Sequence, residues 1–250
     1  MKIAVAGATG RVGRHVADVL HEQGHEVVAI SRANGVDLIT GEGLEAALAG
    51  VEVVIDTATG PSPDQQAATE FFTTATRNLQ DAGKRAGVRR IVVVSIIGID
   101  KLTGGYNAAK LAHERAMLAG PIAVRVLRAS QFHEFVAQLV EWGTQGEVSY
   151  VPQMRTQIVA ARTVAEALVA LATASDSELP DALITEIAGP REESMVALAT
   201  ALAGRRNMPV KVEGVLDSAD HDAALMAEGG LLPGPDAVLA GPTFAEWLES

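Results

Sequence analysis

The sequence contains no cysteine among its 250 residues. This absence excludes a disulfide framework, a thiol nucleophile and a cysteine-ligated metal. The six histidines show no HExxH or comparable spacing, so we predict no metal site. Five of these histidines fall at expected surface or helix positions and are assigned no role: His15, His21, His25, His113 and His221.

Aromatic residues are also scarce, at 4% of the chain, although 48% of the residues are hydrophobic. The core must therefore consist mainly of Val, Ala, Leu and Ile. A chain of this length fits one large α/β domain, or one such domain with a small appended lobe.

Positive charge is limited to 20 basic residues against 31 acidic ones, a net charge of −11, and no run of Lys or Arg occurs. Since phosphate neutralisation needs a clustered positive face, we predict no direct contact with nucleic acid. No signal peptide precedes the first strand, and no apolar run is long enough to span a bilayer. We therefore expect a soluble, cytoplasmic protein that does not contact membranes. The sequence leaves open whether the protein forms a homo-oligomer.

The first half of the chain alternates between two kinds of segment. Continuous apolar runs rich in Val and Ile are typical of strands that are buried on both faces of a parallel sheet, and segments with helical apolar spacing lie between them. This order predicts an α/β fold with a Rossmann-type, doubly wound parallel sheet. The expected strands are 2–6, 26–30, 51–56, 89–95 and 122–128, and the expected helices are 10–24, 62–87 and 106–121.

The alternation is less regular after about residue 129. Two more helices are expected at 128–143 and 163–174, a strand at 181–190, and a short amphipathic segment at 243–250. No internal repeat or flexible linker is present. We predict one NAD(P)-binding domain over residues 1–250, with a substrate-capping lobe formed mainly by residues 129–165 and 190–250.

The stretch "GATGRVG" at residues 7–13 has glycines at GxxGxxG spacing, between the first expected strand and the first expected helix. Glycine is needed there for a sharp turn, for close approach of a pyrophosphate and for tight packing of the helix on the sheet. The helix N-terminus then offers free N–H groups to the phosphates. The turn predicts dinucleotide binding through Gly7, Thr9, Gly10, Arg11, Val12 and Gly13.

The end of the second expected strand decides between NAD and NADP. An NAD site usually has an acidic residue there for the ribose hydroxyls, whereas a 2′-phosphate calls for arginine. This chain has Ser31 and Arg32 and no acid, and Arg11 in the glycine turn is able to join Arg32 at the same phosphate. We therefore predict NADP(H) as the cofactor. The alternative is that both arginines are ordinary surface charges.

Two further stretches fit the carboxyl edge of the sheet. Asp37 follows the second strand, where it either meets the adenine or belongs to a turn. Thr57, Ala58 and Thr59 follow the third strand, and their small side chains either let a ribose or nicotinamide lie close or serve tight packing.

In "GGYNAAK", Tyr106 and Lys110 are four residues apart at the start of an expected helix. Side chains at this spacing share one helix face in any helix. From the residues alone, the pair is either an acid with its activator or a first helical turn with a solvated lysine.

Together with the glycine turn and Arg32, this YxxxK pattern resembles the short-chain dehydrogenase/reductase superfamily, in particular the atypical, NmrA-like branch of NAD(P)H-binding proteins. The resemblance covers nearly the whole chain, and "VVVSIIGID", "LRASQFHEF", "EIAGP" and "TFAEWL" add to it. It implies a Rossmann sheet of about seven strands, with substrate bound over the C-terminal lobe.

The resemblance also implies roles for three catalytic residues. Tyr106 would protonate a carbonyl oxygen as hydride arrives, and Lys110 would bind the nicotinamide ribose and lower the tyrosine pKa. Ser95 would bond the substrate carbonyl. The next two positions are Ile96 and Ile97, however, so the Ser95 hydroxyl either takes this catalytic role or turns toward the cofactor or the core.

Substrate contacts are expected in "RASQFHEF". Gln131 and His133 would bond a substrate oxygen, while Phe132 and Phe135 supply an apolar wall. The alternative is that the phenylalanines belong to a helix core and that His133 packs locally.

The function that these observations favour is an NADP(H)-dependent oxidoreductase that reduces a small ketone, enone or quinone-like molecule. The first alternative is a redox-sensing regulator of the NmrA type that binds NADP without chemistry. The second is a nucleotide-sugar epimerase or dehydratase, ranked last because that class is expected to need a larger C-terminal part.

Overall fold

A computed structural model describes residues 1–250. Its central sheet has seven strands in the order β12-β9-β5-β4-β3-β1-β2. The pairs β1–β2, β1–β3, β3–β4 and β9–β12 are all parallel, which confirms the predicted Rossmann-type sheet. The strands are β1 (Lys2–Ala6), β2 (Glu26–Ile30), β3 (Val53–Asp56), β4 (Arg90–Ile96), β5 (Ala123–Ala129), β9 (Ile184–Ala188) and β12 (Val238–Leu239).

Strand β1 is the point where the direction of winding reverses. The chain passes from β1 to β2 on one side and then returns to place β3 on the other side of β1. In an open parallel sheet, ligands bind beside the carboxyl ends of the strands at such a switch point. The residues that follow β1, β2 and β3 therefore hold the position where a cofactor site is expected.

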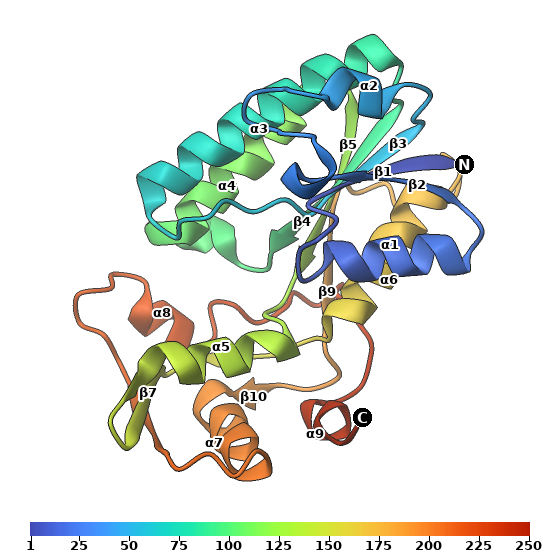
Figure 1. Ribbon diagram of the computed structural model, residues 1–250. Helices are drawn as coiled ribbons and strands as arrows, with labels where there is room; N and C mark the ends of the chain where they lie inside the picture. The colour runs from blue at the N-terminus through green and yellow to red at the C-terminus, as the bar shows by residue number, and fades with distance from the viewer. The chain divides into compact units, whose positions relative to one another are not determined.

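Helices cover both faces of this sheet. Figure 1 shows α2, α3 and α4 on one face and α1 and α6 on the other. The apolar stripe of α1 buries Val16, Val19 and Leu20, as its helical spacing predicts. The helices are α1 (Gly13–Glu22), α2 (Leu44–Leu48), α3 (Gln65–Ala86), α4 (Gly105–Leu118) and α6 (Ala161–Thr173).

The ends of α3 show why this helix is well defined. The Asp64 side chain accepts a hydrogen bond from the Ala67 N–H, which is an N-cap. The helix ends before Gly87, whose φ of +81° is the left-handed C-terminal conformation that glycine adopts without strain. Phe72 is fully buried on this helix, in a small cluster with Ala68 and Ala109 of α4.

The chain divides into two compact units. The first comprises Met1–Ser95, Gly105–Arg128 and Val164–Thr185, and the second comprises Ile96–Gly104, Ala129–Thr163 and Glu186–Ser250. The expected capping lobe, 129–165 and 190–250, falls mainly within the second unit. That this unit covers a substrate stays a prediction.

The second unit has its own hydrophobic core. Side chains from α5, α7 and α9 form it, among them Val136, Leu198 and Phe244. Its three-stranded sheet has the order β11-β7-β6, and β8 pairs with β10. The elements are α5 (His133–Gly143), α7 (Met195–Arg205), α8 (Ala223–Ala227), α9 (Phe244–Glu249), β6 (Thr144–Gln145), β7 (Val148–Pro152), β8 (Arg155–Thr156), β10 (Glu193–Ser194) and β11 (Lys211–Val215).

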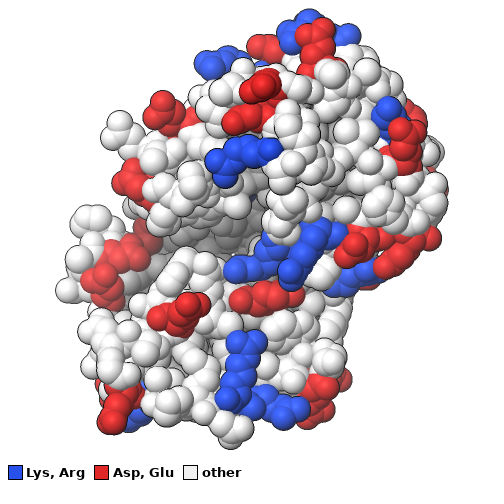
Figure 2. Space-filling view, viewed as in Figure 1, with Lys and Arg blue, Asp and Glu red and all other residues white.

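Some elements differ from the sequence-based expectation. The helix expected from residue 128 begins at His133, because residues before it continue β5 and Phe132 then forms a bridge with Val159. The pattern did not predict α2, α7 or β7, nor the short 3-10 helices η1 (Arg32–Asn34) and η2 (Ile99–Lys101). None of the helices combines the length and hydropathy needed to cross a bilayer. Figure 2 shows basic and acidic side chains interspersed on the face in view.

Candidate functional site

The glycine turn follows β1 in the first unit. Gly7 has a φ of +75°, its N–H donates to the Ile30 carbonyl at 3.0 Å, and its carbonyl accepts from the Gly10 N–H at 2.9 Å. Helix α1 then begins at Gly13, with no side-chain cap and no acidic residue in its first turn. The first N–H groups of α1 therefore lack a side-chain acceptor, which suits an anionic ligand.

Two of the glycines are also required by the packing of the protein itself. A Cβ on Gly7 would lie 2.9 Å from the Cα and N of Ala58. A Cβ on Gly13 would lie 2.1 Å from the Gly7 carbonyl oxygen and 2.8 Å from the Thr57 Oγ1. Because these contacts involve backbone atoms, the turn has no room for a larger residue at either position.

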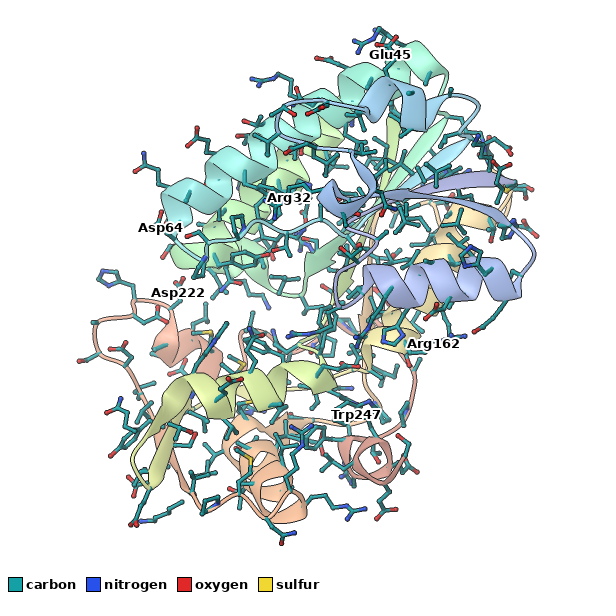
Figure 3. All side chains as sticks on the ribbon, in the orientation of Figure 1. Arg32, Glu45, Asp64, Arg162, Asp222 and Trp247 are labelled. Carbon is teal, nitrogen blue, oxygen red and sulfur yellow. The ribbon has the colours of Figure 1, made fainter.

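The residues after β2 carry an unusual polar atom. The Ser31 Oγ is buried and has no hydrogen-bond partner in the protein. Arg32, labelled in Figure 3, is exposed at the start of η1. Since buried hydroxyls normally have a partner, this orphan oxygen is what a site for a polar ligand would leave.

Asp37 shapes the loop that follows. Its Oδ1 accepts hydrogen bonds from the Ile39 N–H at 2.7 Å and the Thr40 N–H at 3.3 Å. Asn78 of α3 ties the same loop down by donating to the carbonyls of Leu38 and Ile39, both at 2.8 Å. The structure thus gives Asp37 a turn role, and its contact with adenine stays a prediction.

The loop after β3 connects the glycine turn to α4. The Thr57 Oγ1 donates to the Ala6 carbonyl at 2.8 Å, and Ala58 lies against Gly7. One residue further on, the Thr59 Oγ1 lies 2.9 Å from the Tyr106 hydroxyl. Three adjacent residues of this loop therefore bring the turn and the tyrosine into one site.

Tyr106 is half-buried at the start of α4. Gly105 before it has a φ of +60°, and its N–H donates to the Gln65 Oε1 at 2.9 Å. The Tyr106 ring packs edge-on against Phe72, with 5.8 Å between the ring centroids. Burial raises the pKa of the Tyr106 phenol, and the hydrogen bond with Thr59 partly opposes this. The phenol therefore keeps its proton at neutral pH, as a proton donor must.

Lys110 is buried rather than solvated, with 5% of its surface exposed. Its Nζ lies 2.9 Å from the His113 Nδ1 and 4.7 Å from the centroid of the Phe72 ring. Burial lowers the pKa of Lys110 to about 8, while the charges of Asp56 and Glu114 oppose the shift. The alternative of a surface lysine in a plain helical turn is therefore wrong.

The partner of this lysine is His113, a residue that was expected to have no role. His113 is 2% exposed, and its Nε2 lies 3.1 Å from the Oδ2 of Asp56, which is 3% exposed. Burial would raise the pKa of Asp56, but the hydrogen bond with His113 and the charge of Lys110 outweigh it and lower the value. An aspartate at the end of a fully apolar strand was the available signal, because a buried carboxylate needs a partner.

Ser95 lies in a buried network with Glu114 and Arg128. Its Oγ donates to the Glu114 Oε2 at 2.9 Å, and Arg128 donates to both oxygens of Glu114, at 3.1 Å from Nε and 2.7 Å from Nη2. The hydroxyl that the structure places beside Tyr106 is therefore that of Thr59. A catalytic role of Ser95 stays a prediction.

The three expected substrate residues lie in the second unit, where each of them has a polar or backbone partner. The Gln131 Oε1 accepts a hydrogen bond from the Thr156 Oγ1 at 2.6 Å. Phe132 is half-buried and forms its backbone bridge with Val159. Their contacts with a substrate stay predictions.

His133 is fully buried in the core of the second unit. Its Nε2 donates to the Ile158 carbonyl at 3.2 Å, and its ring meets those of Phe244 and Trp247 edge-on, at 5.5 and 5.4 Å. Trp247 is labelled in Figure 3. Burial lowers the pKa of His133 to about 4. These contacts are those of a packing residue, and a bond from His133 to substrate stays a prediction.

Comparison with known families bears on what the glycine turn does. The model of a family described as NAD(P)H-binding matches residues 7–175, starting at the first glycine of the turn and extending past α4. The chain belongs to this NAD(P)H-binding family. Membership supports a nicotinamide cofactor for this chain and does not distinguish NAD from NADP, while binding by the glycine turn itself stays a prediction.

Solved structures show the same fold. A structure of MoeE5 in complex with UDP-glucose and NAD has a TM-score of 0.72 at 20% identity, and the match covers 100% of this chain and 96% of that one. A short-chain dehydrogenase/reductase superfamily protein from Agrobacterium tumefaciens with bound NAD has a TM-score of 0.68 at 19% identity, covering 100% and 95%. No protein with a curated description matches the sequence.

A third similar structure concerns the size argument used above. The UDP-glucose 4-epimerase of Thermus thermophilus in complex with NAD has a TM-score of 0.68 at 19% identity, and the match covers 96% of this chain and 90% of that one. This similarity shows the fold alone, so the expectation that such enzymes need a larger C-terminal part stays a prediction.

Proposed function

We propose that this NAD(P)H-binding protein is an NADP(H)-dependent oxidoreductase that reduces a small ketone, enone or quinone-like molecule. The observation that carries the proposal is the loop after β3, which packs Ala58 on the glycine turn and bonds Thr59 to the Tyr106 hydroxyl. The glycine turn, which would bind the dinucleotide, and the protonated Tyr106 phenol thus both contact the same loop. This is the combination that carbonyl reduction requires.

The residues present fit such a cofactor. The uncapped start of α1 and the glycine turn suit the pyrophosphate, and the orphan Ser31 hydroxyl suits the ribose next to the adenine. With no acidic residue at the end of β2, Arg32 favours a 2′-phosphate, and Arg11 is proposed to join it. When bound, the reduced nicotinamide supplies a hydride to the substrate carbon.

The protein's own part in the reaction is to supply a proton and to hold the phenol that carries it. Tyr106 would donate its phenolic proton to the substrate oxygen, since burial keeps the phenol protonated. Thr59 would hold the phenol oxygen in place through the 2.9 Å hydrogen bond. Lys110 would bind the nicotinamide ribose; the expected lowering of the Tyr106 pKa by Lys110 is wrong, because burial raises this pKa and the Thr59 hydrogen bond opposes the shift.

A second candidate is a reaction on a nucleotide sugar. The UDP-glucose-bound neighbour matches over the full length of this chain, which supports it. The fold alone does not transfer a substrate, however, because sequence identity is 20%. A regulator that binds the cofactor without turnover is the third reading.

One experiment separates these readings. NADPH and NADH oxidation would be followed with panels of quinones, enones, ketones and 4-keto nucleotide sugars, and the affinity of each cofactor would be measured by calorimetry. We expect turnover with a small carbonyl acceptor and tighter binding of NADPH. Turnover with nucleotide sugars alone would favour the second candidate, and cofactor binding without any turnover would favour a regulator.

A further inference from the structure

Three ionisable side chains form an unbroken buried line in the first unit. They run from Lys110 through His113 to Asp56, with the 2.9 and 3.1 Å contacts described above. At the far end of the line, the second carboxylate oxygen of Asp56 also has a hydrogen-bond partner, because the Oδ1 accepts from the Ala58 N–H at 2.9 Å. The line thus begins at the lysine of the YxxxK pattern and ends on the loop that touches the glycine turn.

The chemistry of the three groups fixes their protonation. A lysine ammonium only donates hydrogen bonds, so the His113 Nδ1 must accept. The His113 Nε2 then carries the ring proton and donates it to the Asp56 carboxylate. His113 is therefore a neutral imidazole in one tautomer, which agrees with the lowering of its pKa by burial and by the nearby Lys110 charge.

Packing restricts the geometry further. The His113 ring stacks on Phe72 with 4.6 Å between centroids and 15° between planes, and the Lys110 Nζ lies over the same ring. A cation over an aromatic face is attracted to it. Phe72, His113 and Lys110 are all buried, so the Phe72 ring packs against both polar groups inside the protein.

The charges that act on Lys110 come from two elements, and a residue of a third element pairs with one of them. Asp56 ends β3, Glu114 follows His113 on α4, and Arg128 of β5 is paired with Glu114. Arg128 therefore pairs with Glu114 directly, and Lys110 is linked to Asp56 through the neutral His113 ring. A buried polar line of this kind costs desolvation that apolar residues of similar size would avoid, so stability is a weak explanation for it.

We propose that His113 and Asp56 are positioning residues, which hold the Lys110 ammonium in one place and keep it charged for its role beside the cofactor. The inference rests on the proposed function, since it assigns these two residues to the same site. His113 acts only through Lys110 and touches neither substrate nor cofactor.

The test compares two substitutions of His113. His113→Phe keeps a ring that stacks on Phe72 but removes both hydrogen bonds, whereas His113→Asn keeps an oxygen near the Nδ1 position to accept from Lys110. Loss of one hydrogen bond to a charged group is expected to lower NADPH affinity or turnover by about ten- to hundredfold. We expect this loss in His113→Phe and substantial recovery in His113→Asn.

A second readout needs no cofactor. The rate at which an acylating reagent modifies the Lys110 amine would be measured against pH by mass spectrometry, with exposed Lys84 as internal reference. Both His113→Phe and Asp56→Asn should move the midpoint for Lys110 to lower pH, because each removes a group that favours the ammonium. His221→Asn, an exposed change in the second unit, serves as the control and should leave both readouts unchanged.

An unchanged labelling midpoint in folded His113→Phe would overturn the inference, as would a shifted midpoint with wild-type NADPH affinity and turnover. If wild-type protein reduces no acceptor, the proposed function fails. The labelling midpoint and the NADPH affinity still decide the role of His113 and Asp56 in that case.

Discussion

Replacing Gly7 by alanine tests how the glycine turn is built. Gly7 and Gly24 have the same φ of +75°, but a Cβ on Gly7 would lie 2.9 Å from the Ala58 backbone, whereas a Cβ on Gly24 would meet nothing within 4 Å. Gly24→Ala therefore carries only the cost of a left-handed alanine, about 1–2 kcal/mol. Gly7→Ala adds the cost of a forced contact, about 1–3 kcal/mol.

The free energy of unfolding should therefore fall by about 1–2 kcal/mol in Gly24→Ala and by about 2–5 kcal/mol in Gly7→Ala. Urea unfolding, followed by circular dichroism, measures both values, provided that the dependence on urea concentration is the same in all three proteins. Equal losses in the two variants would show that Ala58 yields to the added methyl group. The close packing of the turn on the loop after β3 would then be refuted.

Three further predictions concern single side chains. Thr59→Val should raise the pKa of Tyr106 because it removes the hydrogen bond to the phenol, whereas Thr59→Ser keeps a hydroxyl and should not. The Tyr106 pKa would be measured from phenolate absorbance in a Tyr150→Phe background, in which Tyr106 is the one remaining tyrosine. Arg32→Ala should weaken NADPH by about ten- to hundredfold and NADH little, and calorimetry that finds equal losses would remove Arg32 from the 2′-phosphate. Folding lowers the pKa of His133 from 6.5 to about 4, so at pH values between these two the unfolded chain binds more protons than the folded protein. Stability should therefore fall as pH drops from 6.5 to about 4, and less steeply in His133→Phe, as urea unfolding at several pH values would show.

Local patterns were sufficient to predict the sheet and the glycine turn. Continuous apolar runs indicated the strands of the first unit. These strands are buried on both faces of the sheet, so their apolar residues follow one another without alternating with polar ones. The turn was recognisable because its glycines are needed at fixed positions; Gly7 and Gly13 each approach a backbone too closely for any side chain. The alternation of strands and helices predicted a doubly wound parallel sheet, but it did not predict the order of the strands.

The partners of the site residues were not predictable in the same way. Ser95 is followed by apolar residues in the sequence, and nothing local shows that its hydroxyl donates to Glu114. The link between His113 and Asp56 joins residues 57 positions apart, so it exists only once α4 packs beside β3. In the second unit, the helix that contains Met195–Arg205 was missed because it is apolar without a clear stripe.

Replacing Tyr106 by phenylalanine tests whether Tyr106 donates the proton in an NADPH-dependent reduction. The substitution removes one hydroxyl and keeps the ring that packs against Phe72. NADPH affinity should stay at the wild-type value, while the rate of acceptor reduction should fall by about 10²–10⁴. A folded Tyr106→Phe protein that reduces the acceptor at the wild-type rate would contradict the account and remove Tyr106 from the mechanism.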